Sequence, residues 1–295
     1  MEYYGIHVAL STPFNADGSA VDHAKLAALV KDQIDNGIHG LIPGGSTGEF
    51  AALSVKERKA VTKTVVKAAK GWVPVTVGVG AMTTVEAVEL ASHAKTAGAD
   101  AVLLLGPYYE EPSETEFQSY VAAVADAGLP ILLYNNPAGT GYSLSPRFVQ
   151  RLSRIKGVIA IKDTTTDAAH TEEIRELCGR RLQVLSGQDT LQLAAFAGGA
   201  RAAVWGAPNA VPAACTELFR CVVERRDIAA GRRLWRKLYP VNRFFETEGY
   251  VAAVKAGAAL RGIDLGPPRL PIKPLGDKPN GRLRKLMTAL GEIGA

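Results

Sequence analysis

The chain has 295 residues, of which 47% are hydrophobic and 21% are charged. These shares are typical of a globular protein and exclude a disordered chain or a fibrous repeat. The length allows one large domain or two small ones.

The formal net charge of +5 is concentrated in the C-terminal segment 269–295, which holds six basic and two acidic residues. A nucleic-acid-binding protein more often carries a basic stripe interleaved with exposed aromatic residues, and the sequence shows none. The segment is therefore interpreted as a solvated terminal helix. No nucleic-acid partner is expected.

Three cysteines, Cys178, Cys215 and Cys221, form no CxxC pair and are odd in number. This usage favours reduced thiols in a cytosol over a disulfide framework or a metal bound through sulfur. The chain starts with acidic and aromatic residues, whereas a secretory signal is basic and then apolar. The longest uncharged stretch, 127–146, is broken by Asn, Pro and Gly. A cytoplasmic protein with no membrane partner is expected.

Short apolar segments of strand length alternate along the chain with longer amphipathic segments. Eight segments are predicted as strands: 5–10, 39–43, 73–77, 101–105, 130–134, 158–162, 182–186 and 201–205. Between them, helix starts are predicted after the capping residues Asp22, Ser54, Thr83 and Ser113, and helix ends at Gly37, Gly98 and Gly128.

Eight strand–helix units, with Val, Ile, Leu and Ala on both strand faces, predict an α/β protein of the (β/α)8 TIM-barrel class with extra C-terminal helices. Residues 1–227 are expected to form the barrel. Residues 228–295 are expected to form accessory helices packed on it as part of one structural unit. A doubly wound open sheet fits the same alternation, but its GxGxxG fingerprint is missing after the first strand.

In a barrel of this kind the catalytic groups lie at the carboxyl ends of the strands. Lys162 ends the sixth predicted strand, inside a buried apolar run where desolvation favours the neutral amine. A neutral lysine attacks carbonyl carbons and forms a Schiff base that serves as an electron sink. The alternative is a buried structural lysine neutralised by Asp163 or another carboxylate.

Two neighbouring features favour the catalytic interpretation of Lys162. Tyr134 ends the adjacent strand and is a candidate general acid and base for a carbinolamine. The loop 44–49 offers main-chain N–H groups and the hydroxyls of Ser46 and Thr47, a composition that can hold a carboxylate. Taken alone, the tyrosine could be a core residue and the loop a flexible turn. Together with Lys162 they indicate a site for a 2-oxo acid.

Other titratable residues are weaker candidates. The five histidines show no paired ligand spacing, and no metal or cofactor motif is found. Lys255 also lies among apolar residues, but its segment is interpreted as an accessory helix from which the side chain extends to water. Neither the histidines nor Lys255 is assigned a catalytic role.

Over nearly its full length the chain resembles the dihydrodipicolinate synthase and N-acetylneuraminate lyase family of class I Schiff-base aldolases. The motifs that carry the resemblance occur in order along the chain: 5–14 (GIHVALSTPF) followed by Asp17-Gly18, 44–49 (GGSTGE), 106–109 (GPYY), 134–137 (YNNP), 161–163 (IKD), 186–189 (SGQD) and 269–275 (RLPIKPL).

The resemblance implies specific roles for matching residues. Lys162 would be the Schiff-base lysine, and Tyr134 would shuttle protons at the reacting carbon. Thr47 would bind the keto-acid carboxylate together with loop N–H groups such as that of Gly45. Ser46 would link the tyrosine to a proton relay.

Further implications concern the pocket wall and the assembly. Gly187 and Val204 would line the pocket through their backbone. Tyr109 would contribute to a neighbour's site across a dimer interface, since the family commonly forms a homotetramer built as a dimer of dimers. No cofactor is implied, because the covalent intermediate forms on Lys162.

Two positions depart from the family's synthases. They carry an arginine two residues after the proline of Tyr-Asn-x-Pro, where it grips the carboxylate of the aldehyde substrate, and here that position is Gly139. Losing a charge-assisted pair should impair the lysine-pathway reaction strongly. Trp205 stands where a small residue is usual, and is interpreted as packed core rather than as pocket wall.

The resulting expectation is a metal-independent lyase, either an aldolase or a dehydratase, that acts on pyruvate or a related 2-oxo acid through a lysine imine and enamine. One alternative is dihydrodipicolinate synthase itself, which condenses pyruvate with aspartate semialdehyde. An alternative of another class is a non-catalytic barrel that binds a 2-oxo acid.

Overall fold

The computed structural model describes residues 1–294 and contains the eight strands that the sequence predicts. They are β1 (Gly5–Ala9), β2 (Gly40–Ile42), β3 (Thr76–Gly78), β4 (Ala101–Leu105), β5 (Ile131–Asn135), β6 (Val158–Asp163), β7 (Gln183–Ser186) and β8 (Ala202–Trp205). All pairs are parallel, in the order β2-β1-β8-β7-β6-β5-β4-β3. A parallel bridge between Leu41 and Val75 closes β2 onto β3. The predicted (β/α)8 barrel is confirmed.

Five strands (β2, β3, β5, β7 and β8) begin one to three residues later than the sequence pattern predicts, and in two of them a proline precedes the start. β3 begins at Thr76 rather than at residue 73, and β5 begins at Ile131 rather than at residue 130. Pro74 and Pro130 precede these starts. Proline has no N–H to donate to a sheet, so it stands before the paired residues or at their edge.

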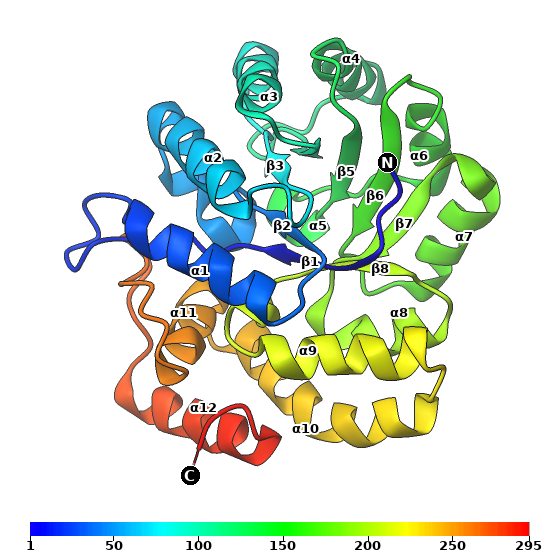
Figure 1. Ribbon diagram of the computed structural model, residues 1–295. Helices are drawn as coiled ribbons and strands as arrows, with labels where there is room; N and C mark the ends of the chain where they lie inside the picture. The colour runs from blue at the N-terminus through cyan, green and yellow to red at the C-terminus, as the bar shows by residue number, and fades with distance from the viewer. Residues whose placement is uncertain (295) are drawn as a thin grey trace.

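Helices surround the strands as a ring (Figure 1). They are α1 (His23–Asp35), α2 (Val55–Ala69), α3 (Thr84–Ala97), α4 (Glu114–Ala125), α5 (Pro137–Thr140), α6 (Pro146–Leu152), α7 (Ala168–Cys178), α8 (Gln192–Ala197), α9 (Pro212–Phe219), α10 (Ile228–Thr247), α11 (Tyr250–Leu260) and α12 (Asp277–Leu290). The four predicted capping side chains each accept a backbone N–H in the first turn of their helix. Within residues 1–294, no helix combines the length and apolar character needed to span a bilayer.

The barrel interior and the layer between strands and helices are two separate buried clusters. Because successive side chains of a strand point to opposite faces, β8 directs Val204 into the interior and Trp205 into the outer layer. Trp205 is completely buried there. Its interpretation as packed core is confirmed, and it does not form part of the interior wall.

The last three helices form a group beside the barrel, seen in yellow to red in Figure 1. α10 begins at Ile228, the first residue of the predicted accessory segment, and contacts α8, α9, α11 and α12. α11 contacts the turn that follows β2. The accessory helices therefore reach the end of the barrel where polar loops follow the strands. The division of the chain at residues 227 and 228 remains a prediction.

Candidate active site

Lys162 and Tyr134 meet inside the barrel. They are paired in register across β6 and β5, and each is 7% exposed. Lys162 Nζ lies 4.1 Å from the centre of the Tyr134 ring. Apolar side chains of the interior cluster, including Leu132 and Leu185, surround this pair at the neighbouring positions of the strands. The two residues that the sequence placed at the centre of the site are thus adjacent.

Asp163 does not neutralise Lys162. As the next residue of the strand it points to the opposite face, where its carboxylate accepts hydrogen bonds from Asn135 Nδ2 (3.0 Å) and from the hydroxyls of Thr165 (2.7 Å) and Thr171 (2.8 Å). The carboxylate is occupied by these donors outside the barrel interior. The geometry therefore does not support the structural alternative in which Asp163 is the partner of the lysine.

Gly187 gives Lys162 the space that it occupies. A Cβ atom at position 187 would lie 2.5 Å from Lys162 Cε and 2.6 Å from Thr164 Cγ2, both closer than real Cβ contacts. The Gly187 N–H donates to the carbonyl oxygen of Asp163 (2.8 Å), which fixes the end of β7 against the end of β6. A glycine here permits close approach of the backbone to the lysine side chain.

The loop after β2 contributes to a small cavity shared with Tyr134. Residues Ser46–Gly48 form a 3-10 turn in which Thr47 is buried and Ser46 is exposed. The cavity is lined by Gly44, Gly45, Ser46, Phe50, Gly78, Gly80, Leu103, Leu105 and Tyr134. The structure therefore brings Gly45 and Ser46 to the same cavity as the tyrosine, as the sequence predicts.

Two further predicted residues occupy different environments. Val204 lies in the interior cluster with Tyr134. Tyr109, in contrast, is 86% exposed in the loop after β4 and does not line the cavity shared by Ser46 and Tyr134. Its role in a partner's site stays a prediction.

A carboxylate that the sequence analysis did not assign, that of Asp189, lies close enough to Lys162 for the two charges to interact. Asp189 follows β7 and is 4% exposed; it accepts hydrogen bonds from Tyr250 Oη (2.6 Å) and from the Ala207 N–H (3.2 Å). Burial raises the pKa of Asp189 to about 7; Tyr250 opposes this shift, Glu246 adds to it, and Lys162 lowers it again. Asp189 belongs to the SGQD motif, so the sequence offered a signal for it. Tyr250 lies in α11, and no local sequence pattern predicts its contact with Asp189.

Lys255 is where the sequence interpretation is wrong. Its side chain does not extend to water: it is 3% exposed, and Nζ lies 2.6 Å from Glu49 Oε1, in the loop that follows β2. A lysine on α11 can be buried because a carboxylate more than two hundred positions earlier in the chain neutralises it. Spacing within the helix carries no signal of that partner.

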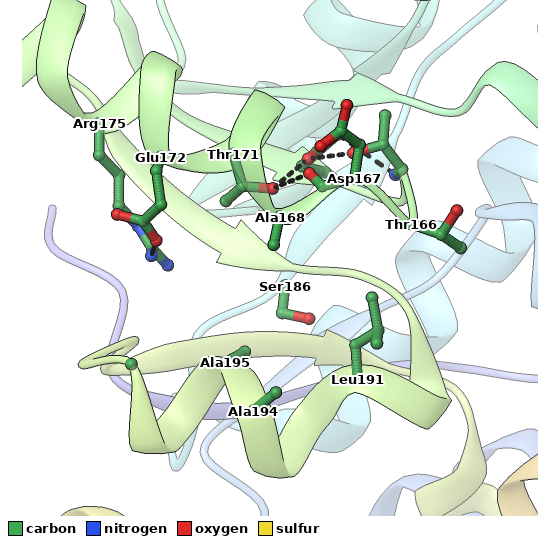
Figure 2. Close-up of a pocket in the computed structure, with 13 residues that line it drawn as sticks. Thr166, Asp167, Ala168, Thr171, Glu172, Arg175, Ser186, Leu191, Ala194 and Ala195 are labelled. Atoms are coloured by element: carbon green, nitrogen blue, oxygen red, sulfur yellow. Dashed lines mark hydrogen bonds and ion pairs between the residues drawn. The ribbon is translucent and has the colours of Figure 1, made fainter.

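A larger groove lies between α7 and α8, outside the strands (Figure 2). Figure 2 shows Thr171, Glu172 and Arg175 of α7 on one side and Ala194 and Ala195 of α8 on the other. Lys162 and Tyr134 do not line it. Because Lys162 and Tyr134 meet in the barrel interior, the candidate active site lies there and not in this groove.

The sequence model of the dihydrodipicolinate synthetase family matches residues 2–290. This chain belongs to that family. A relative from Nitratidesulfovibrio vulgaris (strain Miyazaki F), named 4-hydroxy-tetrahydrodipicolinate synthase, is 39% identical over 99% of this chain and 100% of its own length. Members of the family are class I, metal-independent lyases, and this chain is a lyase of the same kind.

Solved structures of family members have the same fold. The crystal structure of YagE, a prophage protein of the dihydrodipicolinic acid synthase family from E. coli K12 in complex with pyruvate, matches with a TM-score of 0.93 at 31% identity, covering 99% of each chain. The chloride-inhibited dihydrodipicolinate synthase from Acinetobacter baumannii, complexed with pyruvate, matches with a TM-score of 0.93 at 32% identity, covering 98% of this chain and 99% of its own.

Gly139, at the position where an arginine is expected in the family's synthases, lies in the short helix α5. A Cβ atom there would lie 2.4 Å from Asn136 Nδ2, the end of a flexible side chain. The Asn136 amide oxygen in turn accepts a hydrogen bond from the Thr164 hydroxyl (3.2 Å). The side chain nearest to this position is therefore a neutral amide, and its own partner is a neutral hydroxyl. Across residues 1–294, no three His, Cys, Asp or Glu residues are grouped so as to hold a metal ion.

Proposed function

We propose that Lys162 is the nucleophile of this lyase and that its first substrate is pyruvate or a related 2-oxo acid. The observation that carries the proposal is the position of Lys162 Nζ, 4.1 Å from the Tyr134 ring centre and enclosed by the barrel interior. The two solved family members that contain pyruvate support the choice of ligand.

In this mechanism the neutral Lys162 amine attacks the keto carbon and forms a carbinolamine. Loss of water gives the iminium ion, and loss of a proton from the adjacent carbon gives the enamine. The enamine attacks an aldehyde in the synthetic direction, and cleavage of a carbon–carbon bond produces it in the other. Tyr134 transfers the protons, with Ser46 as its relay partner. No cofactor is required, because the imine itself accepts the electron pair.

The loop after β2 holds the carboxylate of the 2-oxo acid. The Thr47 hydroxyl and loop N–H groups, including that of Gly45, are hydrogen-bond donors that recognise a carboxylate without a cationic side chain. Gly187 and Val204 line the remaining wall. The burial of Thr47 and Gly45 and the position of Val204 in the interior cluster support these assignments.

We further propose a homotetramer, a dimer of dimers, in which Tyr109 enters the site of a neighbouring subunit. Its 86% exposure within one chain is what supports this role, since burial of the ring in an interface would remove apolar surface from water. A reducing cytoplasmic environment fits three cysteines that are all buried free thiols.

A second candidate function is condensation of pyruvate with aspartate semialdehyde. The name of the Nitratidesulfovibrio relative favours it, whereas Gly139 argues against it because the site lacks the expected arginine. A coupled assay with aspartate semialdehyde distinguishes the two: turnover comparable to that with other acceptor aldehydes supports the synthase.

The test of the proposed function is reductive trapping. Wild-type protein incubated with pyruvate and sodium borohydride should gain the mass of one reduced pyruvate, and peptide mapping should place it on Lys162. Lys255, the other buried lysine, should remain unmodified. Lys162→Ala should show neither adduct nor turnover; activity retained in that variant would overturn the mechanism. Bound pyruvate without adduct in the wild type would favour a non-catalytic barrel.

A further inference from the structure

A buried ion pair connects the accessory helix α11 to the loop that holds the proposed carboxylate site. Lys255 Nζ and Glu49 Oε1 are 2.6 Å apart, and their side chains are 3% and 2% exposed. Glu49 directly follows the Ser46–Gly48 turn. The pair thus acts on the loop from outside the cavity that Ser46 shares with Tyr134.

Both members of the pair make a further contact. Lys255 Nζ also donates to the Pro267 carbonyl (3.1 Å) and lies 4.3 Å from the centre of the Phe14 ring. Glu49 Oε2 accepts the backbone N–H of Arg269 (2.8 Å). These contacts offset part of the cost of burying two charges.

Glu49 has a backbone conformation that needs support. Its φ angle is 57°, in the left-handed region that residues with a Cβ atom rarely adopt. The residue before it, Gly48, is fixed from the other side, because its carbonyl accepts a hydrogen bond from Thr12 Oγ1 (2.7 Å). A loop in this conformation depends on contacts that come from elsewhere in the chain.

We propose that Lys255 is a positioning residue for the carboxylate of the 2-oxo acid: through Glu49 it holds the Gly45–Thr47 loop in the conformation that binds substrate. This inference rests on the proposed function. Lys255 does not attract the substrate directly, because Glu49 cancels its charge. It acts by geometry, and its loss leaves a buried carboxylate unpaired within two residues of Thr47.

The substrate carboxylate does not react, so its hydrogen bonds to the loop are equally strong in the bound substrate and in the transition state. A misplaced loop therefore weakens binding of the 2-oxo acid without slowing the steps at Lys162. This predicts a particular kinetic signature, which a general loss of stability does not produce: a higher KM at nearly constant kcat.

The experiment uses Lys255→Met and the isosteric Glu49→Gln, with pyruvate and borohydride as the probe. The readout is the pyruvate concentration that gives the half-maximal rate of trapping on Lys162. We expect this concentration to rise about tenfold or more in each variant, with a maximal trapping rate within about threefold of wild type. Glu49→Gln retains the side-chain volume, so it tests the inference even if Lys255→Met fails to fold.

A matched control comes from the same helix. Arg261, at the end of α11, pairs with Asp32 of α1 at 2.6 Å, and the two side chains are 14% and 16% exposed. Arg261→Met breaks an ion pair of the accessory segment without touching the loop. It should lower thermal stability and leave the half-saturating pyruvate concentration unchanged.

The outcomes separate the two proposals. If wild-type protein is trapped and the folded Lys255→Met and Glu49→Gln variants show wild-type half-saturation, the positioning role is overturned and the Schiff-base mechanism stands. If the control Arg261→Met raises half-saturation as much as they do, the effect belongs to general destabilisation and the role is again overturned. If wild-type protein forms no adduct, the proposed function fails and this inference fails with it.

Discussion

Lys162 Nζ lies over the ring of Tyr134, 4.1 Å from the ring centre. The tyrosine therefore packs its ring face against the lysine and also brings a phenol hydroxyl to the same part of the barrel interior. The ring face packs against the lysine amine and holds it in place, and the phenol can carry a proton. These two contributions come from different atoms of one side chain. They can therefore be separated by substitution.

Tyr134→Phe should preserve the position of the lysine and remove the proton carrier. Because the ring remains, the free energy of unfolding should change little. Turnover, once an acceptor aldehyde is known, should fall by about 10²- to 10⁴-fold, the usual contribution of a general acid or base. Turnover, borohydride trapping and a thermal melt should be measured for the variant and for the wild type. A variant with wild-type turnover would show that Tyr134 is only a packing residue.

Gly187→Ala should displace Lys162. The added methyl group would lie 2.5 Å from Lys162 Cε, so the lysine has to move and the rate of trapping with pyruvate should drop at least about tenfold. Gly281→Ala, in α12 with open space around its Cα, is the control. It should retain trapping and gain about 0.4–1 kcal/mol of stability. Equal trapping by both variants would contradict the close approach.

Local sequence pattern predicts most of this architecture for a physical reason. Each strand is a short buried run, and several helices begin at a capping side chain such as Ser54 or Ser113, so the information lies within a few neighbouring residues. The carboxyl ends of the strands in turn determine where Lys162 and Tyr134 meet. Positions on consecutive strands become neighbours once the barrel closes.

Contacts between distant segments are what the sequence does not reveal. Glu49 and Lys255 are far apart in the chain, and neither shows an unusual local pattern; Lys255 was therefore expected to reach water. The same applies to Asp189 and Tyr250, whose hydrogen bond joins the loop after β7 to α11. Both contacts depend on how α11 packs across the end of the barrel, which periodicity within α11 does not specify.

The stability of the protein should depend on pH through Asp189. Burial raises the pKa of this carboxyl from its ordinary value of 3.8 to about 7 in the folded protein. Between these values the folded state holds a proton that the unfolded state releases. The free energy of unfolding therefore falls as pH rises from about 4 to about 7, by on the order of 4 kcal/mol in total.

Asp189→Asn isolates this contribution, since an amide resembles the protonated carboxyl and still accepts the Tyr250 hydrogen bond. The variant should approach and then exceed the wild type in stability as pH increases through this window. The measurement is denaturant unfolding of both proteins at several pH values, compared as a difference. A difference that is constant from pH 4 to 8 would show that Asp189 titrates in the folded state as it does in water.

Val204 and Trp205 should respond in opposite ways, although they are consecutive residues of β8. Trp205 packs in the outer layer, so Trp205→Leu should lower the free energy of unfolding by about 2 kcal/mol or more through lost packing, and leave the half-saturating pyruvate concentration unchanged. Val204 faces the interior that holds Tyr134, so Val204→Phe should crowd the substrate space and suppress trapping.

The comparison needs only thermal melts and borohydride trapping on the two variants. If Trp205→Leu altered pyruvate binding while Val204→Phe did not, the assignment of inner and outer faces to β8 would be reversed, and with it the wall of the pocket. The expected result means that the inward-facing strand residues determine which substrate fits, whereas Trp205 packs the barrel against the surrounding helices.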